Sequence, residues 1–140
     1  MQIILDTKIK SIIRIDRGED CLEVLKSIAL DKGVSFYFSI IGACAMVELG
    51  YFAPKTKKYF NKEFNADSIE ILSVNGIVAW FEGQPIIHAH GVFSNENYET
   101  FGGHVVKLII SLTGETSIDW LPEKIIKKYD DETGLNLLSI

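Results

Sequence analysis

From Val34 onward, the apolar residues of this chain gather in short runs separated by glycine, proline and polar residues, a pattern typical of β-strands joined by turns. One run before Val34, over residues 8–15, shows the same strand-like pattern. The sequence predicts strands over residues 8–15, 34–41, 45–52, 59–64, 69–74, 77–80, 85–93, 103–112 and 115–120, and residues 135–140 form a last apolar piece. Asn75-Gly76 is typical of a hairpin turn between two of these runs, or of a bulge within one bent hairpin.

A different spacing of apolar residues predicts a helix over residues 20–33. Asp20 can cap its N-terminus, Glu23 can complete a capping box, and Gly33 suits its C-terminus. The residues that form an apolar stripe at helical spacing are Leu22, Leu25, Ile28 and Ala29. A second, shorter helix is predicted over residues 123–129, after Pro122.

These elements predict a single domain that spans residues 1–140, because the chain contains no linker, repeat or low-complexity segment. The expected fold class is α/β (α+β). Many strands with short connections favour a largely antiparallel β-sheet, with one main helix and a short second helix packed on it.

The composition adds an expectation about assembly. Hydrophobic residues make up 47% of the chain, and the mean hydropathy is +0.17. A domain of this size has a large surface relative to its core, so part of the apolar surface is expected to lie between subunits of an oligomer. The alternative is a core that is rich in apolar residues.

The sequence predicts a cytoplasmic protein. No apolar run approaches the roughly 20 residues that span a bilayer, and the first residues show no signal peptide. Cys21 and Cys44 lie in apolar surroundings without metal-binding spacing, as expected of buried free thiols in a reducing compartment.

All three histidines of the chain fall within one short stretch. Strand alternation places His88 and His90 on the same face, and Gly102-Gly103 allow a second strand to begin tightly with His104 near its start. If the two strands are neighbours, three imidazoles converge. They would fill three corners of a tetrahedral zinc site, or a similar divalent site, and leave one corner for water or a ligand.

Histidines in a strand can also have a purely structural role. His88 and His90 can form hydrogen bonds within the sheet or line a contact between subunits. Glu70 and Arg14 are embedded in apolar strands, where either could contact a ligand or orient a histidine. Glu115 could act as a general base towards a metal-bound water. All three charged residues can also face solvent on the outer side of the sheet.

The charge of the chain argues against a broad nucleic-acid interface, because the net charge is −5 and there are only two arginines. Two lysine-rich segments next to a tyrosine remain candidates, since such lysines can hold phosphates while the ring stacks on a base. The residues of the first segment are Lys55, Lys57, Lys58 and Tyr59. The residues of the second are Lys124, Lys127, Lys128 and Tyr129. The alternative is a lysine-rich turn and a solvated helix face.

Several of these landmarks together resemble the PPC domain, the plants-and-prokaryotes conserved domain. The matching pieces follow the family's order over nearly the whole chain. They are Arg14 before Gly18-Glu19, Ile40-Ile41-Gly42-Ala43, Gly50-Tyr51-Phe52, Glu70 to Gly76, Pro85-Ile86-Ile87-His88-Ala89-His90, Gly102-Gly103-His104-Val105 and Thr113-Gly114-Glu115.

The resemblance implies a mainly antiparallel α/β domain that assembles as a homotrimer. In plants such domains follow an AT-hook and take part in transcription regulation and protein assembly, whereas prokaryotic members are usually the bare domain and often carry a DNA-binding label. An AT-hook places Arg-Gly-Arg in the minor groove. Here Arg17-Gly18-Glu19 has an acid where the second arginine would stand.

The sequence therefore favours a homotrimeric PPC-type domain of regulatory or assembly role, which binds a divalent metal such as zinc, or a small ligand, at His88, His90 and His104. Glu70, Arg14, Glu115, Gly102 and Gly103 are candidates for contacts around that site. Two alternatives stay open: a DNA-binding protein that uses the lysine segments, and a zinc-dependent hydrolase or lyase of unknown substrate. No membrane contact is expected.

Overall fold

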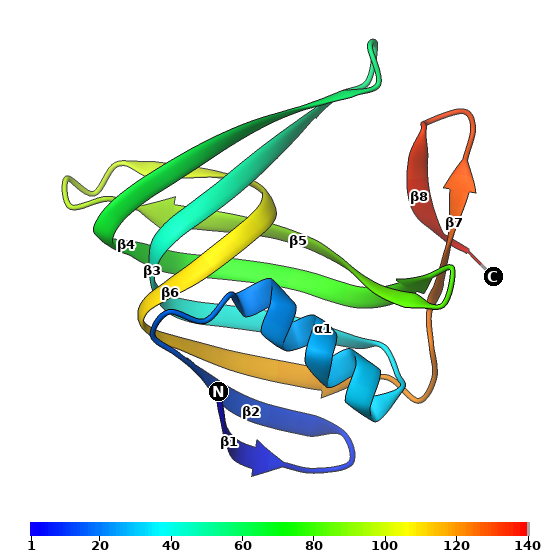
Figure 1. The fold of residues 1–140 in the computed structure, drawn as a ribbon, viewed down its shortest axis with the longest axis horizontal. Helices are drawn as coiled ribbons and strands as arrows, with labels where there is room; N and C mark the ends of the chain where they lie inside the picture. Colours follow the sequence, from blue (N-terminus) through cyan, green and yellow to red (C-terminus); the bar gives the residue numbers. More distant parts are fainter. Residues whose placement is uncertain (140) are drawn as a thin grey trace.

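The computed structural model describes residues 1–139, which form eight strands and one helix (Figure 1). The elements are β1 (Gln2–Asp6), β2 (Lys10–Asp16), α1 (Cys21–Lys32), β3 (Phe36–Ala53), β4 (Lys58–Phe81), β5 (Gln84–Ser94), β6 (Thr100–Trp120), β7 (Ile126–Asp130) and β8 (Leu135–Ser139). The last apolar piece of the sequence ends at Ile140, which lies outside the described residues.

The strands form one sheet in which the four longest strands pair in a ring. β3 pairs antiparallel with β4 and β6, and β5 pairs antiparallel with the same two strands. β1 and β2 extend the sheet beyond β6, and β7 and β8 extend it beyond β4, where β7 makes a single parallel pairing. The expectation of a largely antiparallel sheet is confirmed.

The long strands replace several pairs of shorter predicted ones. β3 runs without a break through Gly42, and β6 runs through Gly114, because each strand bends where its register shifts instead of ending. Gly42 has a φ of 142°, and a Cβ at this position would overlap the carbonyl oxygen of Thr113. This glycine therefore lets β3 and β6 approach closely at the bend.

The hairpin turn considered at Asn75-Gly76 is wrong. Both residues lie inside β4, and Asn75 pairs with His90 of β5. A Cβ at Gly76 would lie 2.6 Å from the carbonyl oxygen of His88 and from the ring of Phe38. The glycine is thus needed for close packing within a strand, which outweighs its preference for turns.

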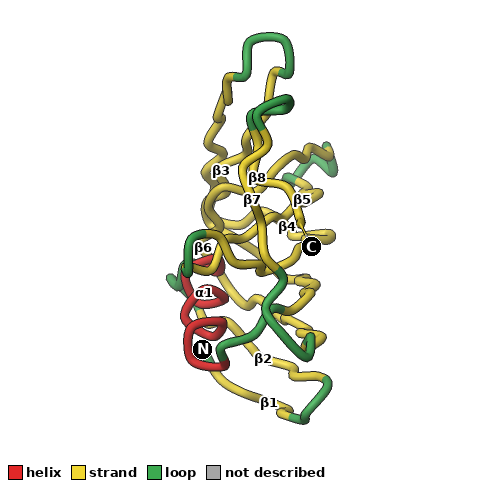
Figure 2. Tube along the Cα trace, turned by 90° about the vertical axis from the view of Figure 1, so that its right-hand side faces the viewer, coloured by secondary structure: helices red, strands yellow, loops and turns green. Residues whose placement is uncertain are grey.

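Helix α1 packs against the sheet, as predicted, and Figure 2 shows it on one side of the molecule. The Asp20 carboxylate accepts a hydrogen bond from the backbone N–H of Leu22 at 3.0 Å, and Gly33 ends the helix in a left-handed conformation. Glu23 pairs with Lys26 at 2.6 Å instead of closing a capping box. With 12 residues, α1 is too short to cross a bilayer, and residues 1–139 contain no other helix.

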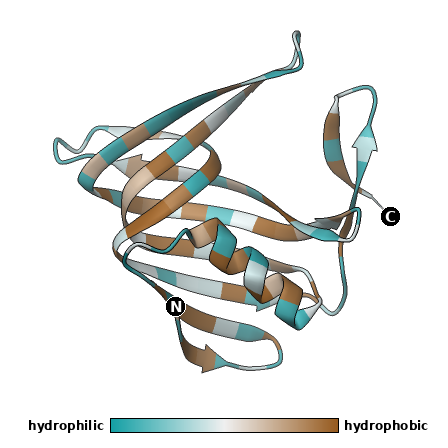
Figure 3. Cartoon of the chain, in the orientation of Figure 1, coloured by the Kyte–Doolittle hydropathy of each residue, from teal (hydrophilic) through white to brown (hydrophobic). Residues whose placement is uncertain are grey.

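The hydrophobic core lies between the helix and the curved strands. Figure 3 shows brown and teal segments alternating along the strands, as expected when one face of each strand is buried. Leu25 of the helix is fully buried, as are Phe36, Phe93 and Leu108 of three different strands. Cys21 and Cys44 are buried and unpaired, as expected.

The short second helix predicted over residues 123–129 is wrong, because β7 occupies most of this segment. β7 pairs with β8 across a tight turn in which Gly134 has a φ of 75°. The Asp130 carboxylate accepts hydrogen bonds from the backbone N–H and the hydroxyl of Thr133, at 2.8 and 2.7 Å. These hydrogen bonds stabilise the turn of a hairpin. The pairing of β7 with β8 therefore determines the conformation of this segment, in place of the helix that the spacing of its residues predicted.

Replacing Gly42 with alanine should lower the free energy of unfolding by about 3 kcal/mol or more, because backbone strain is added to overlap with Thr113. Gly18 is the matched control. Its φ is also positive, at 84°, but a Cβ there would meet nothing within 4 Å, so Gly18→Ala should cost only about 1–2 kcal/mol. Urea denaturation followed by circular dichroism measures both losses, and equal losses would contradict the bend assigned to Gly42.

Candidate metal centre

The first two histidines lie on one exposed face of β5. His88 and His90 are exposed, whereas Ala89 between them is only 1% exposed and faces the core. The alternation predicted from the sequence is therefore confirmed. β5 is paired on one side with β4, where Ile77 lies opposite His88, and this pairing fixes the direction of both imidazoles.

The third histidine comes from β6 and is the direct partner of His90 in the β5–β6 ladder. The next pair along this ladder is Gly91 with Gly103, and Gly102 pairs with Val92. A Cβ at Gly102 would overlap the carbonyl oxygen of Gly91, so the two strands can meet closely here only with glycine. The glycines predicted to begin the second strand tightly therefore serve to place His104 beside β5.

The three imidazole rings converge as predicted. Their centroids lie 5.1 Å apart for His88 and His90, 5.4 Å for His88 and His104, and 5.5 Å for His90 and His104. One nitrogen from each ring lies within 4.8 Å of the other two. In a tetrahedral site with bonds of about 2.0–2.1 Å, ligand nitrogens lie about 3.4 Å apart. Small side-chain rotations would bring the rings to that spacing, so the donor set fits a divalent ion.

The electrostatic surroundings of His88 and His104 favour the neutral imidazole, which is the form that binds metals. Desolvation, together with the charges of His88, His90 and Lys127, lowers the pKa of His104 to about 4. The pKa of His88 is also lowered, mainly by desolvation and then by the charge of Lys127. Hydrogen bonding within the sheet does not account for the rings, because none of them forms a hydrogen bond with a described protein group.

The histidines line one wall of a cavity of about 900 Å³. The opposite walls come from the hairpin of β3 and β4 and from the hairpin of β7 and β8, which stand near each other in Figure 1. The walls are mainly apolar or aromatic. Their lining residues include Tyr51, Phe52, Tyr59, Ile86, Ile87, Tyr129, Leu135, Leu137 and Leu138. Asn136 and Lys127 are the main polar groups besides the histidines.

Lys127 is the site residue whose role the sequence did not predict. It was expected on a solvated helix face, but it lies in β7, is only 8% exposed and lines the cavity. The misassigned helix caused this error, since helical and strand periods place a given side chain on different faces. The run Asp130-Asp131-Glu132-Thr133-Gly134 is a turn signal that could have indicated a hairpin.

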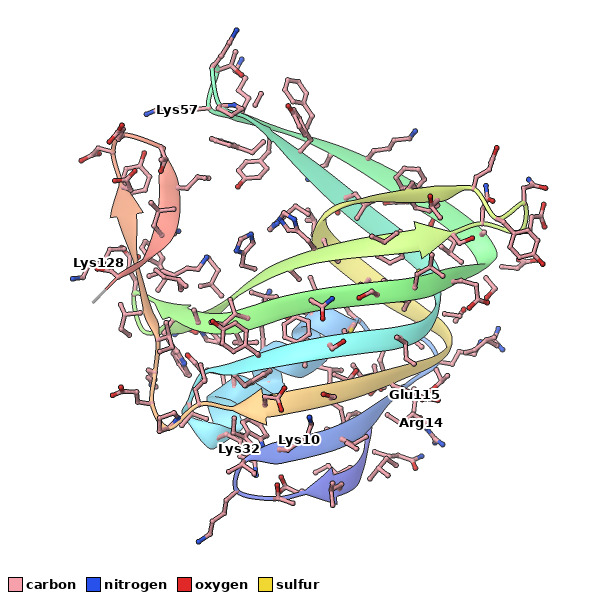
Figure 4. The ribbon with its side chains drawn as sticks, turned by 180° about the vertical axis from the view of Figure 1, so that it is seen from behind. Lys10, Arg14, Lys32, Lys57, Glu115 and Lys128 are labelled. Carbon is pink, nitrogen blue, oxygen red and sulfur yellow. The ribbon has the colours of Figure 1, made fainter. Side chains whose placement is uncertain are left out.

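Glu70, Arg14 and Glu115 lie outside the group of potential metal ligands. Each is exposed. Glu70 pairs with Ser94 at the end of β5, and Arg14 pairs with Glu115 in the β2–β6 ladder, where Figure 4 shows both. The Arg14 guanidinium donates to the Asp16 carboxylate at 2.9 Å. These residues occupy the solvent-facing positions that were the alternative for them.

The first lysine-rich segment forms the tip of the β3–β4 hairpin. Figure 4 shows Lys57 at this tip, and its ammonium donates to the backbone carbonyl of Asp131 at 2.8 Å. This bond links the β3–β4 hairpin to the β7–β8 turn above the cavity. Lys55 and Lys58 are exposed, as expected for a lysine-rich turn. Lys124 of the second segment lies over the Trp80 ring, 3.6 Å from its centroid.

Comparison with known proteins places this architecture among related domains. The sequence model of the Plants and Prokaryotes Conserved (PCC) domain matches residues 6–119. No protein of curated function matches the chain.

Three crystal structures resemble the whole chain. A "putative dna binding protein" from Bacteroides thetaiotaomicron is 27% identical, with a TM-score of 0.91 over 96% of this chain and 94% of that one. A metal-containing protein from Archaeoglobus fulgidus is 26% identical, with a TM-score of 0.85 over 98% and 99% of the two chains. A plant- and prokaryote-conserved (PPC) protein from Pyrococcus horikoshii is 27% identical, with a TM-score of 0.84 over 99% and 95%.

Proposed function

This chain belongs to the Plants and Prokaryotes Conserved (PCC) domain family, and we propose that it is a homotrimeric domain of regulatory or assembly role that binds a divalent metal ion through its three histidines. Zinc, or an ion of similar chemistry, suits a set of three imidazoles. The observation that carries the proposal is the convergence of nitrogens from His88, His90 and His104 within 4.8 Å of one another.

Three further observations support the metal proposal. The rings have no hydrogen-bond partner among the described protein groups, so their nitrogens are available as ligands. The lowered pKa values of His88 and His104 mean that few protons compete with a metal at pH 7. The structural neighbour from Archaeoglobus fulgidus is named as a metal-containing protein.

A bound divalent ion supplies Lewis acidity and a coordination position that three protein ligands leave open. The chain itself supplies the geometry. Strands β5 and β6 hold the imidazoles, and the hairpins of β3–β4 and β7–β8 line the same cavity. An ion held by the three rings would therefore lie at the wall of that cavity.

Assembly into a trimer would cover apolar side chains that a single chain leaves exposed. Ile41, Leu72, Val92 and Leu112 are between 46% and 66% exposed. Leu72 lies in a bulge of β4 next to Ser73, which pairs with Val92 of β5, so two of these side chains occupy neighbouring strands. Exposed apolar residues on adjacent strands are typical of a surface that associates with another copy.

DNA binding has less support in this chain, although the names of two structural neighbours refer to it. Lys57 is held by a backbone carbonyl and Lys127 is buried, so the two lysine segments do not form one exposed basic surface. A hydrolase or lyase would need a proton-transferring side chain near the ion, and Glu115 lies exposed in the β2–β6 ladder and does not line the cavity. Metal binding is therefore the function that the site supports best.

Replacing His90 with alanine should lower the zinc content of the purified protein from about one ion per chain to a small fraction of that, because one of three ligands is lost. Inductively coupled plasma mass spectrometry after mild, chelator-free purification measures this directly. Val106 is the matched control: it lies two residues after His104 in β6, is exposed, and does not line the cavity. The Val106→Ala variant should keep its zinc. A wild-type protein without metal, or equal zinc in both variants, would count against the proposal.

Light scattering coupled to gel filtration should give a mass of three times 15.7 kDa for the wild type. The Leu72→Lys variant should dissociate towards a monomer, because a buried, unpaired ammonium disfavours the interface. Tyr98 is 89% exposed on the loop between β5 and β6 and serves as the control, so Tyr98→Lys should remain trimeric. A monomeric wild type at micromolar concentration would rule out the trimer.

A further inference from the structure

We propose that the cavity beside the three histidines binds a small carboxylate with an apolar or aromatic body, whose carboxylate group lies between the metal position and the ammonium of Lys127. This inference rests on the proposed metal site and specifies the class of its ligand. Three features of the cavity support it: its charge, the burial of Lys127 and the character of its walls.

The charge of the cavity is strongly positive once a metal is present. A divalent ion held by three neutral imidazoles keeps both of its charges, and the ammonium of Lys127 adds a third. Among the described residues that line the cavity there is no aspartate or glutamate to offset them. Positive charges that no negative charge offsets are unfavourable in a space that is partly shielded from water. The cavity therefore favours an anionic ligand.

Lys127 is buried, and the described residues provide no counter-ion for it. It is 8% exposed, and its ammonium forms no ion pair with a carboxylate of the described residues. Lys127 lines the same cavity as all three histidines. Desolvation lowers the pKa of Lys127, and its charge adds to the desolvation that lowers the pKa of His88 and His104. A buried lysine is normally paired, and an anion bound at the neighbouring metal position would supply the missing partner.

The walls of the cavity indicate the rest of the ligand. Tyr59 comes from the β3–β4 hairpin, Tyr129 from β7 and Leu137 from β8, and all three line the same space. The Tyr59 ring lies 6.3 Å from the His104 ring, so an aromatic surface begins close to the metal position. A space of about 900 Å³ with such walls is within the range of pockets that hold small organic molecules. An apolar or aromatic carboxylate matches both the charge and the walls.

Isothermal titration calorimetry tests the proposal in two steps on the same full-length protein. Zinc is first titrated into the chelated protein, and benzoate is then titrated into the zinc-loaded protein. Benzamide, which has the same shape without the charge, and inorganic phosphate, an anion without the apolar body, serve as comparison ligands. The variants are Lys127→Met, which keeps the apolar stem, Lys127→Arg, which keeps the charge, and the control Lys128→Met in the same strand.

We expect benzoate to bind the zinc-loaded wild type and to lose at least tenfold in affinity, or about 1.4 kcal/mol, in the Lys127→Met variant. Zinc affinity should not fall in this variant, because removing a positive charge does not weaken a cation site. Lys127→Arg should restore most of the benzoate affinity, and Lys128→Met should bind like the wild type. Benzamide should bind far more weakly than benzoate.

The possible failures are distinguishable. Absence of zinc binding in the first titration would overturn the metal site, and this inference would fall with it. Zinc binding without benzoate binding would overturn only the ligand proposal, as would equal benzoate affinity in the wild type and Lys127→Met. Tighter binding of inorganic phosphate than of benzoate would contradict the assignment of a carboxylate with an apolar body.

Discussion

The close approach of β5 and β6 at their shared glycines is the constraint on which the site depends. His90 and His104 are direct partners in this ladder, and Gly91 lies opposite Gly103 in the next pair. A side chain at Gly102 would overlap the backbone of β5. Glycine at this position therefore lets the two strands pair closely, and this pairing places the imidazoles of His90 and His104 side by side. His88 lies beside the other two histidines because side chains alternate along β5, which places it on the same face as His90.

The same strand arrangement creates an electrostatic environment suited to a metal ion and an anion. The His104 ring lines the cavity, yet its neighbours desolvate it enough to lower its pKa to about 4. Lys127 lines the same cavity from β7, which pairs with β4 in the sheet. Three converging imidazoles and an ammonium without an ion pair among the described residues are therefore brought together from distant parts of the sequence. This combination favours a ligand that is negative at one end and apolar at the other.

Much of the site could be predicted from the sequence, because its determinants are local. The two-residue spacing of His88 and His90 fixes their common face, and Gly102-Gly103 indicate where His104 begins its strand. Helix α1 was predictable for the same reason, since Asp20 and Gly33 mark its ends. Each of these features can be recognised from residues that lie close together in the sequence.

The features that the sequence did not predict depend on contacts between distant residues. Gly42 and Gly76 look like turn residues in isolation, but each permits close packing within a long strand. Lys127 is accommodated inside the cavity because β7 pairs with β8, and nothing in its immediate neighbours indicates burial.

The most direct test of the metal site is anomalous diffraction on both sides of the zinc absorption edge, from crystals of the protein supplied with zinc. One zinc peak is expected about 2.0–2.1 Å from a nitrogen of each of the three imidazoles, and a map without zinc at that position would contradict the site.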